Sequence, residues 1–107
     1  MHYYPNEIEN IIHQIPGVVE VCVCGLPDII CIDLPAAMVV KSAGSNLSEE
    51  NIFDHVADKM SDIKKLRGGV YFVDEIPKNS SGKYLRKTVK EMVIKLSKTK
   101  KLNYNSN

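Results

Sequence analysis

Long apolar runs are absent from this sequence, and so is an excess of charge of one sign. No segment reaches the roughly 18 consecutive apolar residues of a membrane-spanning helix, so no membrane span is expected. The amino-terminal residues do not show a secretory signal pattern, which predicts an intracellular protein. Lysine and arginine total 14 against 13 acidic residues, a net charge of +1, and this balance argues against a dedicated nucleic-acid-binding protein.

Cysteine is also scarce, with three residues at positions 22, 24 and 31. An odd number without a secretory leader does not suggest a disulfide framework. No Cys-x-x-Cys or paired-histidine spacing is present, so no metal site is expected. Because side chains alternate along a strand, Cys22 and Cys24 share one face, and we expect them to pack in the core as small apolar side chains.

The residues that are present describe one globular domain with a modest core, since 44% of the 107 residues are hydrophobic and 25% are charged. Apolar residues at helical spacing predict three helices, and short runs rich in valine predict three strands. The predicted helices cover residues 5–15, 48–60 and 82–97, and the predicted strands cover residues 18–25, 35–41 and 69–74. Ser48 is the predicted N-cap of the second helix.

These elements predict an α+β fold, a small mixed three-stranded sheet packed with about three helices. The first two strands are expected to pair antiparallel, and the connection through the second helix allows the third strand to run parallel to one of them. The order of the strands does not follow from the sequence. Residues 1–97 form the domain in this interpretation, and residues 98–107, which lack a core pattern, are expected to form a flexible tail.

Residues 77–87 carry the strongest indication of function. A loop with two serines and Gly82 follows the last predicted strand, and we expect Lys83 to project from the first turn of the last helix. A helix N-terminus disfavours cations, so Lys83, Arg86 and Lys87 together suggest that a phosphate or carboxylate binds there. A solvated surface lysine is the alternative. A P-loop is excluded because the required glycine and serine or threonine are missing.

The motif Pro-Lys-x-x-Ser-Gly-Lys-x-Leu-Arg-Lys at residues 77–87 resembles the C-terminal signature of the adenylate-forming, or AMP-binding, enzyme superfamily. The resemblance covers nearly the whole chain. It includes Tyr-Pro-x-Glu-Ile-Glu at 4–9, Pro-Gly-Val-x-Glu-x-x-Val-x-Gly-Leu-Pro-Asp at 16–28 and Pro-Ala-Ala-x-Val-Val at 35–40. The stretch at 64–78 is most similar to insect luciferase-like acyl-CoA synthetases, and the group also includes 4-coumarate–CoA ligase-like enzymes.

This resemblance implies a mobile C-terminal lid that works with a large N-terminal adenylation domain of the same enzyme, which is absent from this chain. The complete enzyme would be an acid–CoA ligase that activates a small-molecule carboxylic acid with ATP and Mg²⁺ and then uses coenzyme A as co-substrate. The resemblance assigns Lys83 to catalysis of adenylation and makes Ser81, Gly82 and Lys78 candidates for contact with substrate or nucleotide. It implies that ATP and Mg²⁺ are bound mainly by the N-terminal domain, and no metal ligand is assigned here.

The chain also departs from the family pattern. A hinge residue and a second lysine that precede Tyr-Pro in the family are missing, and Ile-Asp at 32–33 replaces a common Gly-Glu. Because the N-terminal domain that holds the substrate pocket is also absent, we do not expect this chain to complete the reaction by itself. Residues 105–107, Asn-Ser-Asn, are no carboxyl-terminal peroxisomal signal, and the expected location is cytoplasmic or peroxisomal.

Two alternatives come from other functional classes. A lid without its adenylation domain could act as a binding or regulatory module on a separate partner. A nucleic-acid or acidic-surface binder could use the lysines of the last helix, yet aromatic side chains that would stack on bases do not interleave with them. No nucleic-acid partner is therefore expected.

Overall fold

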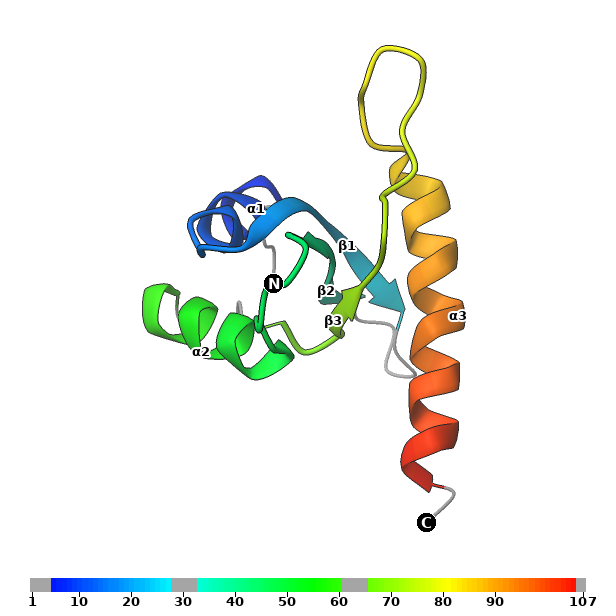
Figure 1. Ribbon diagram of the computed structural model, residues 1–107. Helices are drawn as coiled ribbons and strands as arrows, with labels where there is room; N and C mark the ends of the chain where they lie inside the picture. Colours follow the sequence, from blue (N-terminus) through cyan, green and yellow to red (C-terminus); the bar gives the residue numbers. More distant parts are fainter. Residues whose placement is uncertain (1–4, 28–32, 61–65, 106–107) are drawn as a thin grey trace.

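The computed structural model describes residues 5–27, 33–60 and 66–105. Its elements are, in order, α1 (Pro5–His13), β1 (Val18–Pro27), β2 (Asp33–Lys41), α2 (Glu49–Lys59), β3 (Gly69–Phe72) and α3 (Arg86–Asn105). The strands form one sheet, with α1 and α2 on one face and α3 on the other (Figure 1). This is the predicted α+β fold with a mixed sheet of three strands. No helix in these ranges is both long and apolar enough to cross a membrane.

The sheet has the strand order β1-β2-β3. β1 and β2 are antiparallel, as predicted, and both are longer than predicted because their pairing continues to Pro27 and Asp33. β3 is parallel to β2, which confirms the predicted crossover through α2. β3 ends at Phe72, before the predicted residue 74, where the chain leaves the sheet toward α3. β1 and β3 are therefore the two edge strands of this sheet, and β1 contacts α3 (Figure 1).

Helix α1 covers one face of the sheet with isoleucines at helical spacing. Ile8 and Ile12 are fully buried and pack with strand residues such as Val21 and Val39. Burial of each isoleucine side chain contributes roughly 1.5–3 kcal/mol. The helix ends at His13 rather than at residue 15, because the chain tightens there into i→i+3 hydrogen bonds ahead of a proline.

The opposite face of the sheet forms a second core against α3. Cys22, Cys24 and Met38 are buried there and pack with Val89 and Val93. The predicted core position of the two cysteines is confirmed, while the third cysteine, at position 31, lies outside the described residues. Burial is the main cause that raises the pKa of the Cys22 thiol to about 12. This thiol is therefore protonated, and unreactive as a nucleophile, at neutral pH.

Helix α2 begins with the predicted cap. The Ser48 hydroxyl accepts a hydrogen bond from the Asn51 N–H at 3.2 Å, and the Asn51 side-chain oxygen accepts one from the Ser48 N–H at 2.9 Å. This reciprocal pair satisfies backbone donors that the helix itself leaves unpaired. Ile52 and Val56 on the next turns enter the core under α1.

Replacing Ser48 with alanine is expected to lower the free energy of unfolding of this chain by about 1 kcal/mol, because the Asn51 N–H loses its acceptor. Urea unfolding followed by circular dichroism measures the change. Ser80→Ala is the control, since Ser80 is exposed in a loop, and its effect is expected to stay within about 0.5 kcal/mol. Equal effects of the two substitutions would contradict the capping role.

The limits of α3 differ most from the sequence prediction. The predicted start at residue 82 is wrong, because the helix begins at Arg86 and a separate hairpin precedes it. The predicted end near Ser97 is also wrong, because the helix continues to Asn105. The flexibility expected for residues 98–107 stays a prediction.

Lys100 lies in the additional turns of α3 and contacts the rest of the domain. Its ammonium lies 2.6 Å from a carboxylate oxygen of Glu49 and 5.0 Å from the centre of the Tyr71 ring. It also donates a hydrogen bond to the Val70 carbonyl at 3.3 Å. The far half of α3 is thereby connected to the start of α2 and to β3.

Candidate functional site

The chain between β3 and α3 forms a small hairpin at residues 78–84, called the Lys83 hairpin below (yellow loop in Figure 1). Lys78 and Tyr84 face each other as an isolated antiparallel bridge. Beside this bridge the Asn79 N–H donates a hydrogen bond to the Lys83 carbonyl at 2.9 Å. The two sides of the hairpin are thus joined directly below its tip.

The tip is a tight turn organised by Asn79. The Gly82 N–H donates to the Asn79 carbonyl at 3.0 Å, and Gly82 has a φ of +87°, as in hairpins whose turn ends in a left-handed glycine. The Asn79 side-chain oxygen accepts hydrogen bonds from the Ser81 N–H (2.9 Å), the Ser81 hydroxyl (2.8 Å) and the Lys83 N–H (3.0 Å). Sequence reasoning missed Asn79, although asparagine at the start of a turn commonly binds the backbone ahead of it.

The sequence predicted that Lys83 would project from the first turn of the last helix, and this position is wrong, because α3 begins only at Arg86. Lys83 lies in the hairpin, because the left-handed Gly82 and the bonds to Asn79 shape the backbone before α3 can begin. Its side chain is exposed and has no hydrogen-bond or ion-pair partner within the described part of the chain. The predicted cation cluster at the helix start is therefore reduced to Arg86 and Lys87.

Lys78 is engaged at the base of the hairpin. Its ammonium lies 2.6 Å from a carboxylate oxygen of Glu20 on β1, donates to the Ile76 carbonyl at 3.3 Å and lies 5.6 Å from the centre of the Tyr84 ring. The hydrogen bond with Glu20 is the main cause that raises the pKa of Lys78. All four residues predicted for the site are exposed, but the Lys78 ammonium is paired with Glu20, whereas the Lys83 ammonium has no partner among the described residues.

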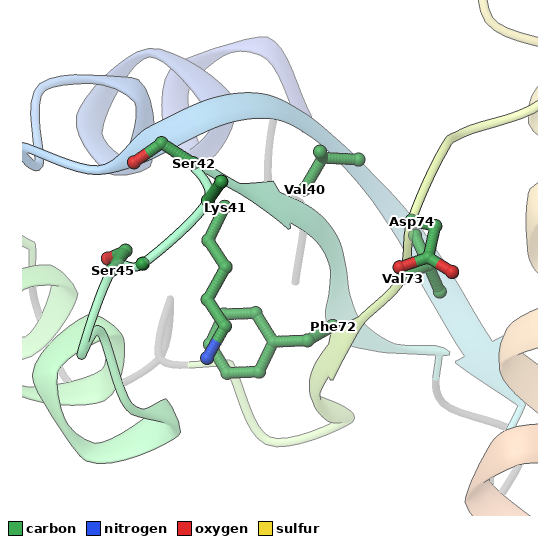
Figure 2. A pocket seen from close by; sticks show the side chains of 9 residues that line it. Val40, Lys41, Ser42, Ser45, Phe72, Val73 and Asp74 are labelled. Carbon is green, nitrogen blue, oxygen red and sulfur yellow. The ribbon is translucent and has the colours of Figure 1, made fainter.

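A separate open groove of about 500 Å³ lies at the end of β2 (Figure 2). The Lys41 side chain extends over the Phe72 ring, with its ammonium 4.6 Å from the ring centre, and donates to the Leu47 carbonyl at 3.2 Å. These contacts keep the Lys41 charge on the domain surface, and Lys83 does not line this groove. The lining residues are Val40, Lys41, Ser42, Ala43, Gly44, Ser45, Phe72, Val73 and Asp74.

Within residues 5–27, 33–60 and 66–105, no group of three or more histidine, cysteine, aspartate or glutamate side chains is placed to hold a metal ion.

Gly82→Ala is expected to lower the free energy of unfolding by about 1 kcal/mol, because an L-residue is strained at a φ of +87°. The added Cβ meets no atom within 4 Å, so the loss comes from the backbone alone. Gly82→Asn is expected to lower the free energy of unfolding by less, since asparagine adopts left-handed angles more readily. Urea unfolding of both variants measures this, and an equal loss in both would argue against backbone strain.

The sequence profile of the AMP-binding enzyme C-terminal domain matches residues 7–83. The chain therefore belongs to this family, the C-terminal domains of adenylate-forming acyl-CoA synthetases and ligases, as its motifs predict. The match ends at Lys83, so it includes the tip of the hairpin.

Curated relatives support the same membership. Luciferin 4-monooxygenase of Photinus pyralis is 45% identical over 94 residues, which cover 88% of this chain and 17% of the relative. The 4-coumarate–CoA ligase-like 9 of Arabidopsis thaliana is 39% identical over 90 residues, which cover 84% of this chain and 16% of the relative. The chain thus spans about a sixth of the length of such relatives.

Solved structures share the fold. The crystal structure of apo MatB from Rhodopseudomonas palustris has a TM-score of 0.84 at 30% identity, covering 91% of this chain and 19% of that one. A Mycobacterium tuberculosis fatty acyl CoA synthetase has a TM-score of 0.79 at 35% identity, covering 87% and 18%. The resemblance inferred from the sequence is confirmed, as is the predicted fold class.

Proposed function

We propose that the chain is the C-terminal lid of an ATP-dependent acid–CoA ligase and that Lys83 assists formation of the acyl-adenylate. The proposal rests on the state of Lys83: its backbone is ordered by Asn79, yet its ammonium is exposed and unpaired within the described residues. An ammonium on an ordered backbone that has no partner in its own domain is available to bind anions held by another domain. Family membership supports the same assignment.

The reaction explains why a cation is needed. In adenylation, a carboxylate oxygen of the acid forms a bond to the α-phosphorus of ATP while the bond to pyrophosphate breaks, and pyrophosphate leaves with the bonding electrons. Both reactants are anions, so their approach is opposed by charge repulsion. An ammonium between the carboxylate and the α-phosphate offsets this repulsion and stabilises charge that develops in the transition state. In the second half-reaction, the coenzyme A sulfur replaces AMP on the acyl carbon.

The remaining parts of the site are assigned to the N-terminal adenylation domain of the complete enzyme. That domain would hold most of ATP, its Mg²⁺, the acid and coenzyme A. Within this chain, Ser81 and Gly82 at the hairpin tip are the proposed contacts to substrate or nucleotide, and Lys78 would reach a ligand from its pair with Glu20. We place the enzyme inside the cell, in the cytoplasm or in peroxisomes.

The test is to measure the two half-reactions separately in the complete enzyme, with and without the Lys83 ammonium. Pyrophosphate release reports on adenylation, and thioester formation from a synthetic acyl-adenylate reports on the second step. The proposal requires that Lys83→Ala slow the first step far more than the second. Equal losses in both steps would overturn it.

A further inference from the structure

The edge of the sheet next to the Lys83 hairpin is closed by side chains rather than by a strand. β1 is an edge strand, and within the described residues it pairs with β2 alone. The outward peptide groups of an edge strand are open to water or to another chain unless something covers them. Two charged residues from separate helices cover β1 at Val23.

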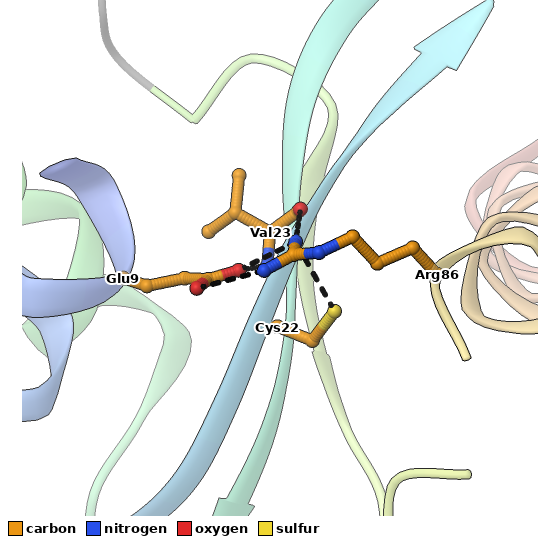
Figure 3. Close-up of polar contacts among 4 residues, drawn as sticks. All are labelled: Glu9, Cys22, Val23 and Arg86. Carbon is orange, nitrogen blue, oxygen red and sulfur yellow. Dashed lines mark hydrogen bonds and ion pairs between the residues drawn. The ribbon is translucent and has the colours of Figure 1, made fainter. Parts of the chain in front are cut away.

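Glu9 of α1 and Arg86 of α3 bind the two polar groups of Val23 (Figure 3). The Val23 N–H donates to a Glu9 carboxylate oxygen at 2.7 Å, and the Arg86 guanidinium donates to the Val23 carbonyl at 3.1 Å. The same guanidinium donates to both carboxylate oxygens of Glu9, at 2.9 and 3.3 Å. Donor meets acceptor at every contact, so at Val23 the pair satisfies the peptide groups that a neighbouring strand would otherwise bind.

This clamp, defined as Glu9, Arg86 and the Val23 peptide groups, is partly withdrawn from water. The Glu9 side chain is 12% exposed, whereas that of Arg86 is 46% exposed. The hydrogen bond to Glu9 is the main cause that raises the pKa of Arg86, so the guanidinium stays charged. Bidentate, charge-assisted bonds of this kind fix geometry as well as distance.

Arg86 is also the first residue of α3, directly after the Lys83 hairpin. One residue earlier, the Leu85 N–H donates to the Pro77 carbonyl at 3.0 Å, which joins both ends of the hairpin next to the clamp. On the other side of the hairpin, Lys78 reaches Glu20 of β1 at 2.6 Å. The hairpin therefore rests on β1 through two charged contacts, with Lys83 beyond them.

We propose that Arg86 is a positioning residue for adenylation, which holds the Lys83 hairpin at a set angle to the sheet through Glu9 and the Val23 carbonyl. This inference rests on the function proposed for Lys83. A misplacement of a catalytic group by about 1 Å can lower a rate by about a hundredfold, so loss of the clamp is expected to slow adenylation even though the Lys83 ammonium is still present. Arg86 directs Nη1 to Glu9 and the Val23 carbonyl and Nη2 to Glu9, and no contact with substrate is assigned to it.

A double-mutant cycle in the complete enzyme tests the inference. Arg86→Ala is expected to slow adenylation by about ten- to a hundredfold and to leave thioester formation from a synthetic acyl-adenylate within about twofold. In the Lys83→Ala background, the same substitution is expected to change adenylation by less than about twofold, because there is no ammonium left to position. A role in stability alone would reduce the rate by the same factor in both backgrounds.

The outcomes separate the two proposals. If Lys83→Ala slows adenylation but Arg86→Ala has no effect, or has the same effect in both backgrounds, the positioning role is overturned and the function of Lys83 stands. If Lys83→Ala has no effect, both are overturned. Should Arg86→Ala fail to fold, Arg86→Lys replaces it in the cycle. Lysine keeps the charge but lacks the planar fork, so a smaller loss that again vanishes without Lys83 is expected.

Discussion

Lys83→Ala in the complete enzyme is expected to slow acyl-adenylate formation by about 10²–10³-fold, the loss typical of removing one donor that stabilises a developing anion. The substitution truncates an exposed side chain of the hairpin tip and leaves the bonds from Asn79 to the backbone in place. The loss therefore reports on charge and not on folding. Thioester formation from a synthetic acyl-adenylate is expected to change by less than about tenfold, because Lys83 is assigned to the first step alone.

Lys95→Ala provides the matched control for Lys83. Lys95 is exposed on α3, and its removal changes the net charge of the domain by the same amount. The adenylation rate of the Lys95→Ala variant is expected to stay within about twofold of that of the unaltered enzyme, since long-range effects of a surface charge are screened by salt. A loss at Lys95 as large as that at Lys83 would mean that the net charge of the domain, and not one positioned ammonium, governs the step.

Gly68→Ala is expected to lower the free energy of unfolding of this chain by about 3 kcal/mol, at the upper end of the range for overpacking. A Cβ at Gly68 would lie 2.8 Å from the carbonyl oxygens of Leu34 and Pro35 and 2.9 Å from the Cβ of Ala36. The Gly68 N–H also donates to the Pro35 carbonyl at 2.8 Å. These atoms belong to β2, so they cannot yield without disturbing the pairing of the central strand.

Thermal unfolding compares Gly68→Ala with Gly44→Ala. A Cβ added at Gly44 would meet no atom within 4 Å, but the residue has a φ of +78°. Gly44→Ala is therefore expected to lower the free energy of unfolding by about 1 kcal/mol, from backbone strain alone. The midpoint is expected to fall by more than about 10 °C for Gly68→Ala and by about half that or less for Gly44→Ala. A smaller fall at Gly68 than at Gly44 would show that the clash is relieved at little cost.

The elements of this fold were predictable wherever local pattern decides them. The isoleucine spacing of α1, the Ser48 cap of α2 and the alternation of Cys22 and Cys24 each predicted the observed burial or helix start. Strand order was not predictable, because the crossover through α2 would allow β3 to lie beside β1 or beside β2. Placement beside β2 depends on contacts between distant segments, such as the bond from Gly68 to Pro35.

The site was predictable in its chemistry and not in its geometry. The Ser-Gly-Lys motif directed attention to Lys83, yet a motif does not reveal that Gly82 turns the chain into a hairpin instead of a helix. The sequence also did not predict which residue pairs with Arg86. Glu9 lies 77 residues away along the chain, and no local rule of spacing connects the two.

Helix α3 is tied to both helices on the opposite face of the sheet, to α1 through Arg86 and Glu9 and to α2 through Lys100 and Glu49. Such partly exposed ion pairs contribute little each, but these two lie on separate turns and oppose sliding of one layer past the other. Combined with the buried contacts of Val89 and Val93, they connect α3 to the sheet and to both other helices, and the Lys83 hairpin protrudes from the start of α3 (Figure 1). A rotation of the whole domain would therefore carry the sheet, the three helices and Lys83 together.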